Sequence, residues 1–221
     1  MSPEVIGLGA GGHAKVAIEI LQQSGQYKLV GLLDPNPELQ GKSLLGVPIL
    51  GDDDRLPSIK AQGVEYFFVG LGSTSNIVPR RRLYELARSL GMKPVTAVHP
   101  SAIISPSAVL GEGATVMAGA IINAGAILGE NVIVNSGAIV EHDCAIGNHV
   151  HIATGARLAG AVRISDNTHI GIGATIRQLI KVGKGSAIGA GAVVVKDVPD
   201  GQILIGNPAR LLRRNQHDGF D

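Results

Sequence analysis

Residues 132–158 read VIVNSGAIVEHDCAIGNHVHIATGARL. Every sixth residue of this stretch is aliphatic, and the series extends without an exception to sixteen positions, from Ile104 to Val194. The residue two places before each of them is mostly small, as at Ala126 and Ala138. A period of six fits neither an α-helix nor a simple alternating strand. It is typical of a parallel β-helix in which each hexapeptide supplies one short strand and one turn.

Three hexapeptides would form one triangular coil of eighteen residues, with the aliphatic side chains inside and the small ones near the corners. Stacked coils bury a continuous apolar column, which stabilises a solenoid. The composition agrees, because 45% of residues are hydrophobic but only 3% are aromatic. Glycines recur at the eighteen-residue interval, and we expect them at corners that need a positive φ. They are Gly111, Gly129, Gly147 and Gly183.

The first 97 residues lack the six-residue period and alternate between strand and helix patterns. Buried strands are expected at 5–8, 29–33, 66–70 and 95–98, and a helix at 78–90. A second helical pattern runs through Val16 and Leu21. This order predicts an α/β domain with a small parallel sheet, of the Rossmann-like kind.

The first strand leads into the run Gly7-Leu8-Gly9-Ala10-Gly11-Gly12-His13. Its glycines satisfy the dinucleotide fingerprint, and Asp34 follows about twenty residues later. NAD binding and a purely structural turn stay open. The domain is short for two complete mononucleotide-binding halves. A glycine-rich turn at a helix N-terminus binds phosphate in general, so a nucleotide-sugar diphosphate would serve as well.

Three histidines cluster within the repeat: His142, His149 and His151. The repeat places His142 on a corner, facing away from the core, between Glu141 and Asp143. A histidine with a pKa near neutrality suits the removal of a proton from an attacking amine or hydroxyl, and a carboxylate can orient its ring. Cys144 falls on an inward small position and is interpreted as packing.

These features together resemble the hexapeptide-repeat acyltransferases, and the Gly-x-Gly-Gly-His turn before the repeat resembles bacterial sugar acetyltransferases of the NeuD/PglD type. The resemblance implies a left-handed β-helix, a homotrimer with active sites between subunits, and acetyl-CoA as co-substrate. It also implies an N-terminal domain, residues 1–97, that binds a nucleotide-linked amino sugar. Residues 98–200 would form the acetyltransferase domain, and 201–221 a C-terminal tail.

Matching the family's motifs residue by residue implies roles for individual positions. His142 would be the general base and Asp143 its orienting carboxylate, although a longer Glu is common at that place. The cofactor-binding positions would be His151, Gly160, Ile172 and Ala190, and the substrate-binding positions Gly11, Gly12, His13, Asp34 and Gly72. The segment 206–210 resembles the Gly-Asn-Pro-Ala-Arg exit that packs near CoA in this family.

The implied activity is transfer of acetyl from acetyl-CoA to a nucleotide-linked 4-amino-4,6-dideoxy sugar by direct attack on the thioester. O-acetylation of a sugar, as in sialic-acid modification, and a noncatalytic scaffold are the alternatives. Carbonic anhydrases of the γ type share the prism and bind zinc through histidines. The spacing of His142, His149 and His151 differs from theirs, so we expect no metal.

The chain's overall composition narrows its surroundings. A net charge of +1 does not favour a nucleic-acid partner. A single cysteine excludes an intramolecular disulfide framework, and no signal peptide or membrane span is recognisable. We therefore expect a soluble cytoplasmic protein.

Overall fold

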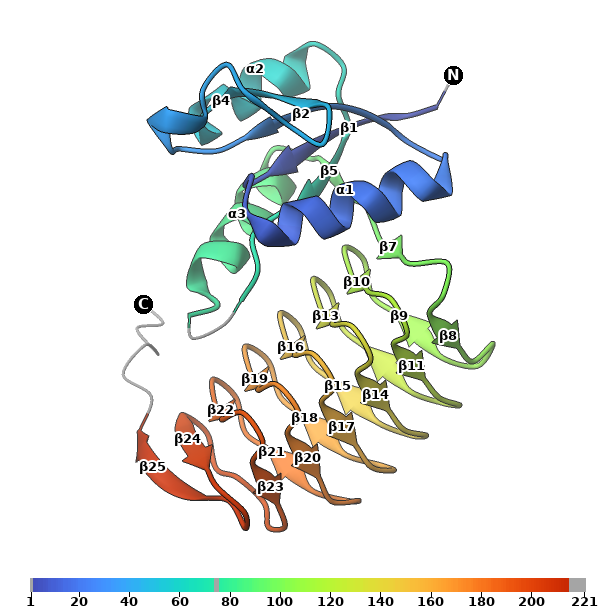
Figure 1. The fold of residues 1–221 in the computed structure, drawn as a ribbon, viewed down its shortest axis with the longest axis vertical. Coiled ribbons are helices and arrows are strands. Elements are labelled where there is room, and N and C mark those ends of the chain that lie inside the picture. Colours follow the sequence, from blue (N-terminus) through green and yellow to red (C-terminus); the bar gives the residue numbers. More distant parts are fainter. Residues whose placement is uncertain (1, 74–75, 215–221) are drawn as a thin grey trace. The chain divides into compact units, whose positions relative to one another are not determined.

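The computed structural model describes residues 2–73 and 76–214 and divides the chain into two compact units. The first unit comprises residues 1–72 and 78–100, and the second comprises 73–77 and 101–221 (Figure 1).

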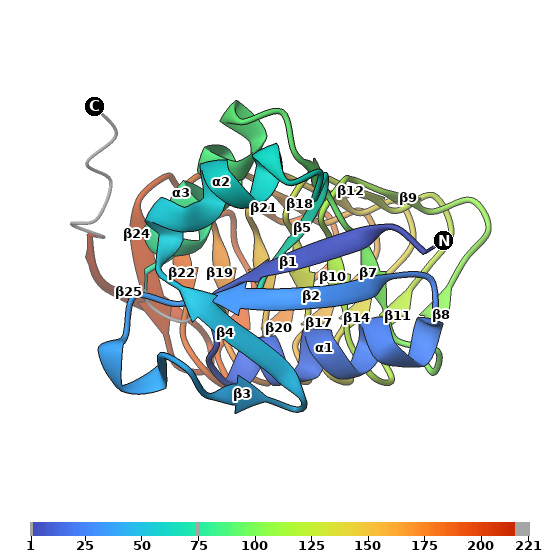
Figure 2. The ribbon, with the colours of Figure 1, turned by 90° about the horizontal axis from the view of Figure 1, so that it is seen from above.

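The first unit is built on a mainly parallel sheet with strand order β3-β4-β2-β1-β5-β6. Its parallel strands pair through backbone hydrogen bonds, and only β3 runs antiparallel to its neighbour (Figure 2). The strands are β1 (Glu4–Leu8), β2 (Lys28–Leu33), β3 (Ser43–Leu44), β4 (Val47–Gly51), β5 (Tyr66–Val69) and β6 (Lys93–Pro94). The helices are α1 (Gly12–Ser24), α2 (Leu56–Ala61) and α3 (Val78–Ser89), with short 3₁₀ turns at Pro37–Leu39 and Asp53–Arg55.

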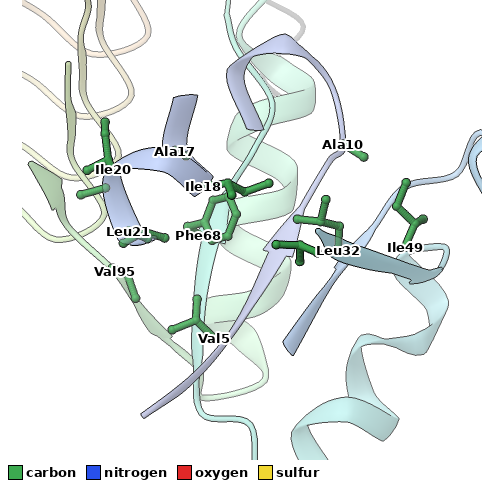
Figure 3. Close-up of a cluster of buried hydrophobic side chains, with 12 residues drawn as sticks. Val5, Ala10, Ala17, Ile18, Ile20, Leu21, Leu32, Ile49, Phe68 and Val95 are labelled. Carbon is green, nitrogen blue, oxygen red and sulfur yellow. The ribbon is translucent and has the colours of Figure 1, made fainter. Parts of the chain in front are cut away.

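Helices cover both faces of this sheet. Successive residues of a strand point to opposite faces, and the apolar residues of β1 therefore need a cover on each side. Val5 packs with residues of α1 such as Ile18 and Leu21 (Figure 3). Ile6, the next residue, packs with residues of α2 and α3 such as Leu56. The arrangement places the N-terminus of α1 directly after the carboxyl end of β1.

Most of the predicted elements of this unit are confirmed, and one is wrong. The segment 95–98 was expected to be one strand. Instead, β6 ends at Pro94 and a separate strand, β7, covers Ala97–Val98. Val95 still donates a hydrogen bond to Phe67, 2.8 Å away, before the chain leaves the sheet. The hairpin of β3 and β4 and the short helix α2 were not predicted.

The second unit is a left-handed parallel β-helix of stacked coils (Figure 1). Each two-residue strand pairs in parallel with the strand one coil further on, so that Ile133 faces His151 and Ile139 faces Arg157. The strands are β8 (Ile103–Ile104), β9 (Val109–Leu110), β10 (Thr115–Val116), β11 (Ile121–Ile122), β12 (Ile127–Leu128), β13 (Ile133–Val134), β14 (Ile139–Val140), β15 (Ala145–Ile146), β16 (His151–Ile152), β17 (Arg157–Leu158), β18 (Arg163–Ile164), β19 (His169–Ile170), β20 (Thr175–Ile176), β21 (Lys181–Val182), β22 (Ala187–Ile188) and β23 (Val193–Val194).

The two inward columns predicted from the repeat are confirmed. From Val116 to Val194 the sixth-residue aliphatic side chains are buried, and only Ile104 and Leu110 in the first coil are half-exposed. The small residues between them are buried as well, including Ala126, Ala138 and Cys144.

The four glycines with the eighteen-residue spacing were expected to have a positive φ, and this expectation is wrong. Gly111, Gly129, Gly147 and Gly183 do not have a positive φ. They lie where successive coils approach closely, since a Cβ on Gly147 would stand 2.7 Å from the backbone nitrogen of Asp166. The positive φ belongs to another column, two residues later along the repeat. It includes every sixth residue from Gly113 to Gly191, eight of them glycine. The others are Asn131, Asp143, His149, Ala161, Asn167 and Leu179.

The C-terminal end of the prism carries an antiparallel pair, β24 (Gln202–Ile205) and β25 (Arg210–Arg214). β24 extends the ladder of β22 in parallel register. Residues 215–221 of the predicted tail lie outside the described residues.

Candidate active site and nucleotide-binding turn

His142 lies on the corner between β14 and β15. The inward side chains of Val140 and Cys144 are buried on either side of it, so the turn between them projects from the prism. The side chains of His142 and Asp143 are 62% and 68% exposed. The structure therefore confirms the outward orientation expected for His142.

The two side chains form a hydrogen-bonded dyad, with 2.9 Å between Nδ1 of His142 and Oδ2 of Asp143. Asp143 reaches the ring although it is shorter than Glu, and its backbone has a φ of 59°, a conformation that Asp adopts more readily than most residues. A carboxylate only accepts hydrogen bonds, so Nδ1 carries the proton and Nε2 has a free lone pair when the ring is neutral.

The hydrogen bond to Asp143 raises the pKa of His142 above its usual value, and the negative charges of Asp143 and Glu141 add to this, while desolvation opposes it. Glu141 itself accepts a hydrogen bond from Asn123, at 2.9 Å. A more basic imidazole with a free Nε2 is suited to take a proton from an attacking nucleophile. The carboxylate stabilises the imidazolium that results.

Gly160, predicted to line the cofactor, lies beside the dyad. A Cβ on Gly160 would stand 2.6 Å from Nε2 of His142. The structure thus brings Gly160 together with His142 and Asp143.

The other three predicted cofactor residues line a separate pocket of about 570 Å³ on the prism. His151 of β16 forms one wall. Ile172 lies in the turn after β19, and Ala190 lies in the turn after β22. Ile172 is 62% exposed, although it is aliphatic. Arg213 of β25 and His169 of β19 also line this pocket and were not predicted to take part in a site.

The ring of His151 is buried and held by a chain of hydrogen bonds. The backbone N–H of Ser136 donates to Oδ1 of Asn135 at 2.7 Å, which turns the amide nitrogen of Asn135 toward Nε2 of His151, at 3.3 Å. Nδ1 of His151 contacts the carbonyl oxygen of Ser73. A carbonyl accepts only, so Nδ1 carries the proton and Nε2 is the acceptor in this network.

His169 packs edge-on against His151, with ring centroids 5.0 Å apart. Burial lowers the pKa of His169 to about 4, although a backbone hydrogen bond with Ser73 opposes the shift. His169 is therefore neutral near pH 7. A neutral neighbour does not repel protons from His151 or from a ligand in the pocket.

In the first unit the predicted substrate residues gather around the N-terminus of α1. Gly11 is the N-cap residue and no side chain caps the helix. A Cβ on Gly11 or Gly12 would meet nothing within 4 Å, so this end of the helix is open. Gly72 lies beside His13, because a Cβ on Gly72 would stand 3.6 Å from Cβ of His13. Exposed N–H groups and the helix dipole favour an anion here.

Asp34 organises the glycine turn through its carboxylate. Oδ2 accepts from the backbone N–H of Ala10 at 2.8 Å, and Oδ1 accepts from that of Asn36 at 2.9 Å. Asp34 also lines a pocket of about 310 Å³ together with Asp53 and Arg82. Burial and the neighbouring carboxylates raise the pKa of Asp53, and Arg82 opposes this.

Arg80 is a residue of this site that the sequence analysis missed. Arg80 is 1% exposed, and its guanidinium donates to the carbonyl oxygens of Val69 and Leu71, at 2.9 and 2.7 Å. The same nitrogen lies 3.3 Å from Nε2 of His13. Burial lowers the pKa of Arg80 to about 9. The sequence Arg80-Arg81-Arg82 has the appearance of a solvated basic surface, and nothing in it marks the first arginine as buried.

The remaining cysteine and histidine of the cluster have structural surroundings. Cys144 is buried, its thiol donates to the carbonyl oxygen of Ala159 at 3.3 Å, and burial raises its pKa. Nδ1 of His149 lies 3.0 Å from the side chain of Asn131. Within residues 2–73 and 76–214, no three His, Cys, Asp or Glu side chains are grouped as metal ligands. In the same ranges, no helix is long and apolar enough to cross a membrane.

Comparison with known proteins gives consistent relatives for both units. The PglD N-terminal domain matches residues 4–86, and the bacterial transferase hexapeptide family matches residues 125–160. PerB from Caulobacter crescentus, solved with CoA and GDP-perosamine, is 39% identical, with 95% of this chain and 97% of PerB covered and a TM-score of 0.88. The acetyltransferase domain of PglB from Neisseria gonorrhoeae is 41% identical, with 96% and 100% covered and the same TM-score.

The chain belongs to the hexapeptide-repeat sugar acetyltransferases of the PglD type. A curated relative, the UDP-N-acetylbacillosamine N-acetyltransferase of Bacillus subtilis, is 37% identical over 119 residues. That match spans half of this chain and half the length of the relative. The predictions of the family and of the enzyme class are confirmed. The prediction of acetyl-CoA as co-substrate agrees with the CoA and acetyl coenzyme A bound in the solved relatives.

Proposed function

We propose that this chain transfers the acetyl group of acetyl-CoA to the amino group of a nucleotide-linked 4-amino-4,6-dideoxy sugar. The observation that carries the proposal is the exposed dyad of His142 and Asp143 on a hexapeptide prism. The relatives support the substrate class, since PerB was solved with CoA and GDP-perosamine.

His142 acts as the general base in this proposal. Its Nε2 takes the proton of the amine as the nitrogen attacks the thioester carbonyl. The C–S bond then breaks, and the imidazolium returns that proton to the departing sulfur, so that CoA leaves as the thiol. Asp143 holds the ring by its hydrogen bond to Nδ1 and stabilises the imidazolium. The acceptor arrives as the free amine, because a protonated amine has no lone pair for the attack.

The proposed cofactor residues are His151, Gly160, Ile172 and Ala190. Three of them line the 570 Å³ pocket, whose walls are mainly apolar and suit the pantetheine arm. Arg213, in the same pocket, offers a cation for a CoA phosphate. These assignments rest on motif matching and on the pocket's chemistry.

The proposed substrate residues are Gly11, Gly12, His13, Asp34 and Gly72. The open N-terminus of α1 suits the diphosphate, and the pocket of Asp34, Asp53 and Arg82 suits the nucleoside. Arg80 positions His13 and the end of β5 through its contacts with Nε2 of His13 and the carbonyl oxygen of Val69.

We also propose a cytoplasmic homotrimer with active sites between subunits, as the family resemblance implies. Exposed aliphatic side chains on the prism support a contact with another subunit. They include Ile103, Val109 and Ile127. Light scattering coupled to size exclusion would measure the mass in solution, and a monomeric mass would contradict this assembly.

The proposed reaction is tested with acetyl-CoA and a panel of UDP-, GDP- and dTDP-linked sugars, each as the 4-amine and as the matching 4-hydroxyl compound. We expect acetylation of amines and release of free CoA thiol, with one nucleotide preferred. Acetylation of hydroxyl compounds and not of amines would instead indicate an O-acetyltransferase. The absence of turnover with every acceptor would favour a noncatalytic scaffold.

A further inference from the structure

The dyad of His142 and Asp143 lies on an outer corner of the prism. In the direction in which the coils stack, it lies between a glycine of the preceding coil and a glycine of the following coil. Gly125 belongs to the turn between β11 and β12, one coil before the dyad. Gly160 belongs to the turn between β17 and β18, one coil after it. Backbone hydrogen bonds link these turns, from the N–H of Asp143 to Ala124 at 3.0 Å and from that of Ala161 to His142 at 2.8 Å.

Both glycines touch the dyad at the place where a side chain would begin. A Cβ on Gly160 would stand 2.6 Å from Nε2 and 2.7 Å from Cε1 of His142. A Cβ on Gly125 would stand 2.8 Å from Oδ1 of Asp143. These separations are shorter than real carbon contacts, so an alanine at either place would displace the imidazole or the carboxylate.

The backbone alone does not require glycine at either position. Ala124 precedes His142 by one coil in the same column as Gly160, so that column accepts a Cβ. Ala161 follows Asp143 by one coil in the same column as Gly125, and it has the left-handed backbone with a φ of 56°. The dyad alone therefore explains glycine at 160, whereas at 125 the positive φ and the carboxylate of Asp143 both favour it.

We infer that Gly125 and Gly160 are positioning residues, whose missing side chains leave the space in which Asp143 and His142 form their hydrogen bond. The inference rests on the proposed role of His142 as the base. It differs from the cofactor role proposed for Gly160, because it acts on the imidazole and not on acetyl-CoA.

The first test is Gly160→Ala in the full-length protein, alone and combined with His142→Asn. Displacing the ring from Asp143 should lower kcat by about 10- to 100-fold, because small misplacements of a reacting group are costly. The loss should remain in kcat when acetyl-CoA is saturating, whereas any rise in the KM for acetyl-CoA would report the separate cofactor role proposed for Gly160. In the His142→Asn background the same change should have less than about a twofold effect, since no imidazole remains to be displaced.

A titration of the His142 imidazole by NMR gives a readout that is independent of turnover. Because the hydrogen bond to Asp143 raises its pKa, Gly160→Ala should lower that pKa toward the ordinary histidine value. An unchanged pKa would overturn the inference, as would an equal loss of kcat in the His142→Asn background or a change confined to the KM for acetyl-CoA. Full activity of His142→Asn alone would refute the proposed base, and the titration would still decide the inference.

A second pair of variants separates contact from backbone strain. Gly125→Ala and Gly119→Ala each add a Cβ at a positive φ, 70° and 66°. A Cβ on Gly119 would meet only the backbone nitrogen of Gly137, at 4.0 Å, so this variant adds the strain without touching the dyad. Both should lower the melting temperature similarly, but only Gly125→Ala should lower kcat and the pKa of His142. Equal effects of the two variants on kcat would contradict the inference.

Discussion

Among single residues, the hydrogen bond between Asp143 and His142 matters most for the proposed reaction. Oδ2 of Asp143 lies 2.9 Å from Nδ1 of His142, and Nε2 lies beside Gly160 of the next coil. The outward placement of both residues could be predicted from the sequence, because the repeat fixes which positions face outward. The reach of the shorter carboxylate could not, since the repeat does not fix where a side chain ends.

Replacing Asp143 by Asn should change the pH dependence of the reaction. The carboxylate raises the pKa of His142, and the base is active only when neutral, so activity is lost as the pH falls through that raised pKa. In Asp143→Asn the acidic limb of kcat/KM should move to lower pH, and the plateau should fall by about tenfold or more, because the amide can also favour the wrong tautomer. Rate profiles between about pH 5 and 9 measure both effects. An acidic limb that stays in place would show that another group controls it.

At the scale of the elements, one column of turn residues defines the corners of the prism. All its members have a positive φ, from Gly113 to Gly191, and most of them are glycine or asparagine. Leu179 is an exception, with a φ of 63° and a side chain that is 71% exposed. Left-handed backbone costs an ordinary residue roughly 1–2 kcal/mol. The side chain of Leu179 is too exposed to offset this cost by burying apolar surface.

Exchanging residues within this column should change stability in opposite directions. Leu179→Asn should raise the free energy of unfolding by about 0.5–1 kcal/mol, because Asn tolerates the left-handed conformation. Gly137→Ala should lower it by about 1 kcal/mol, since its φ is 65° and a Cβ there would contact nothing that compensates. Urea unfolding of both variants measures the two changes. Destabilisation by Leu179→Asn would mean that the leucine makes a stabilising contact.

For the whole molecule, the prism could be predicted from the sequence, but the burial of individual polar residues in the two units could not. A repeat of sixteen positions leaves one way to bury its aliphatic residues. Arg80 and His169 lack such a pattern, because their burial is decided by segments far away in the sequence. The glycines with an eighteen-residue spacing were correctly placed at corners, but a sequence does not distinguish a close approach from a positive φ.

Burial of His169 should make the stability of the fold sensitive to acid. Its folded pKa of about 4 lies below the ordinary 6.5, so between these values the unfolded chain binds a proton that the folded chain does not. Stability is therefore lost as the pH falls through this window, by up to about 3 kcal/mol from this residue. His169→Asn should flatten the pH dependence of unfolding from 6.5 to 4. The same slope in both proteins would contradict the burial of a neutral His169.

The most direct test of the account compares the original protein with His142→Asn on one nucleotide-linked 4-amino sugar and acetyl-CoA. We expect kcat to fall at least about 100-fold, because removal of a general base typically costs a factor of about 10²–10⁴ in rate. The melting temperature and the affinity for CoA should stay unchanged, since the His142 side chain is 62% exposed and lies outside the core. A variant that keeps kcat within about tenfold would contradict the role of His142 as the base.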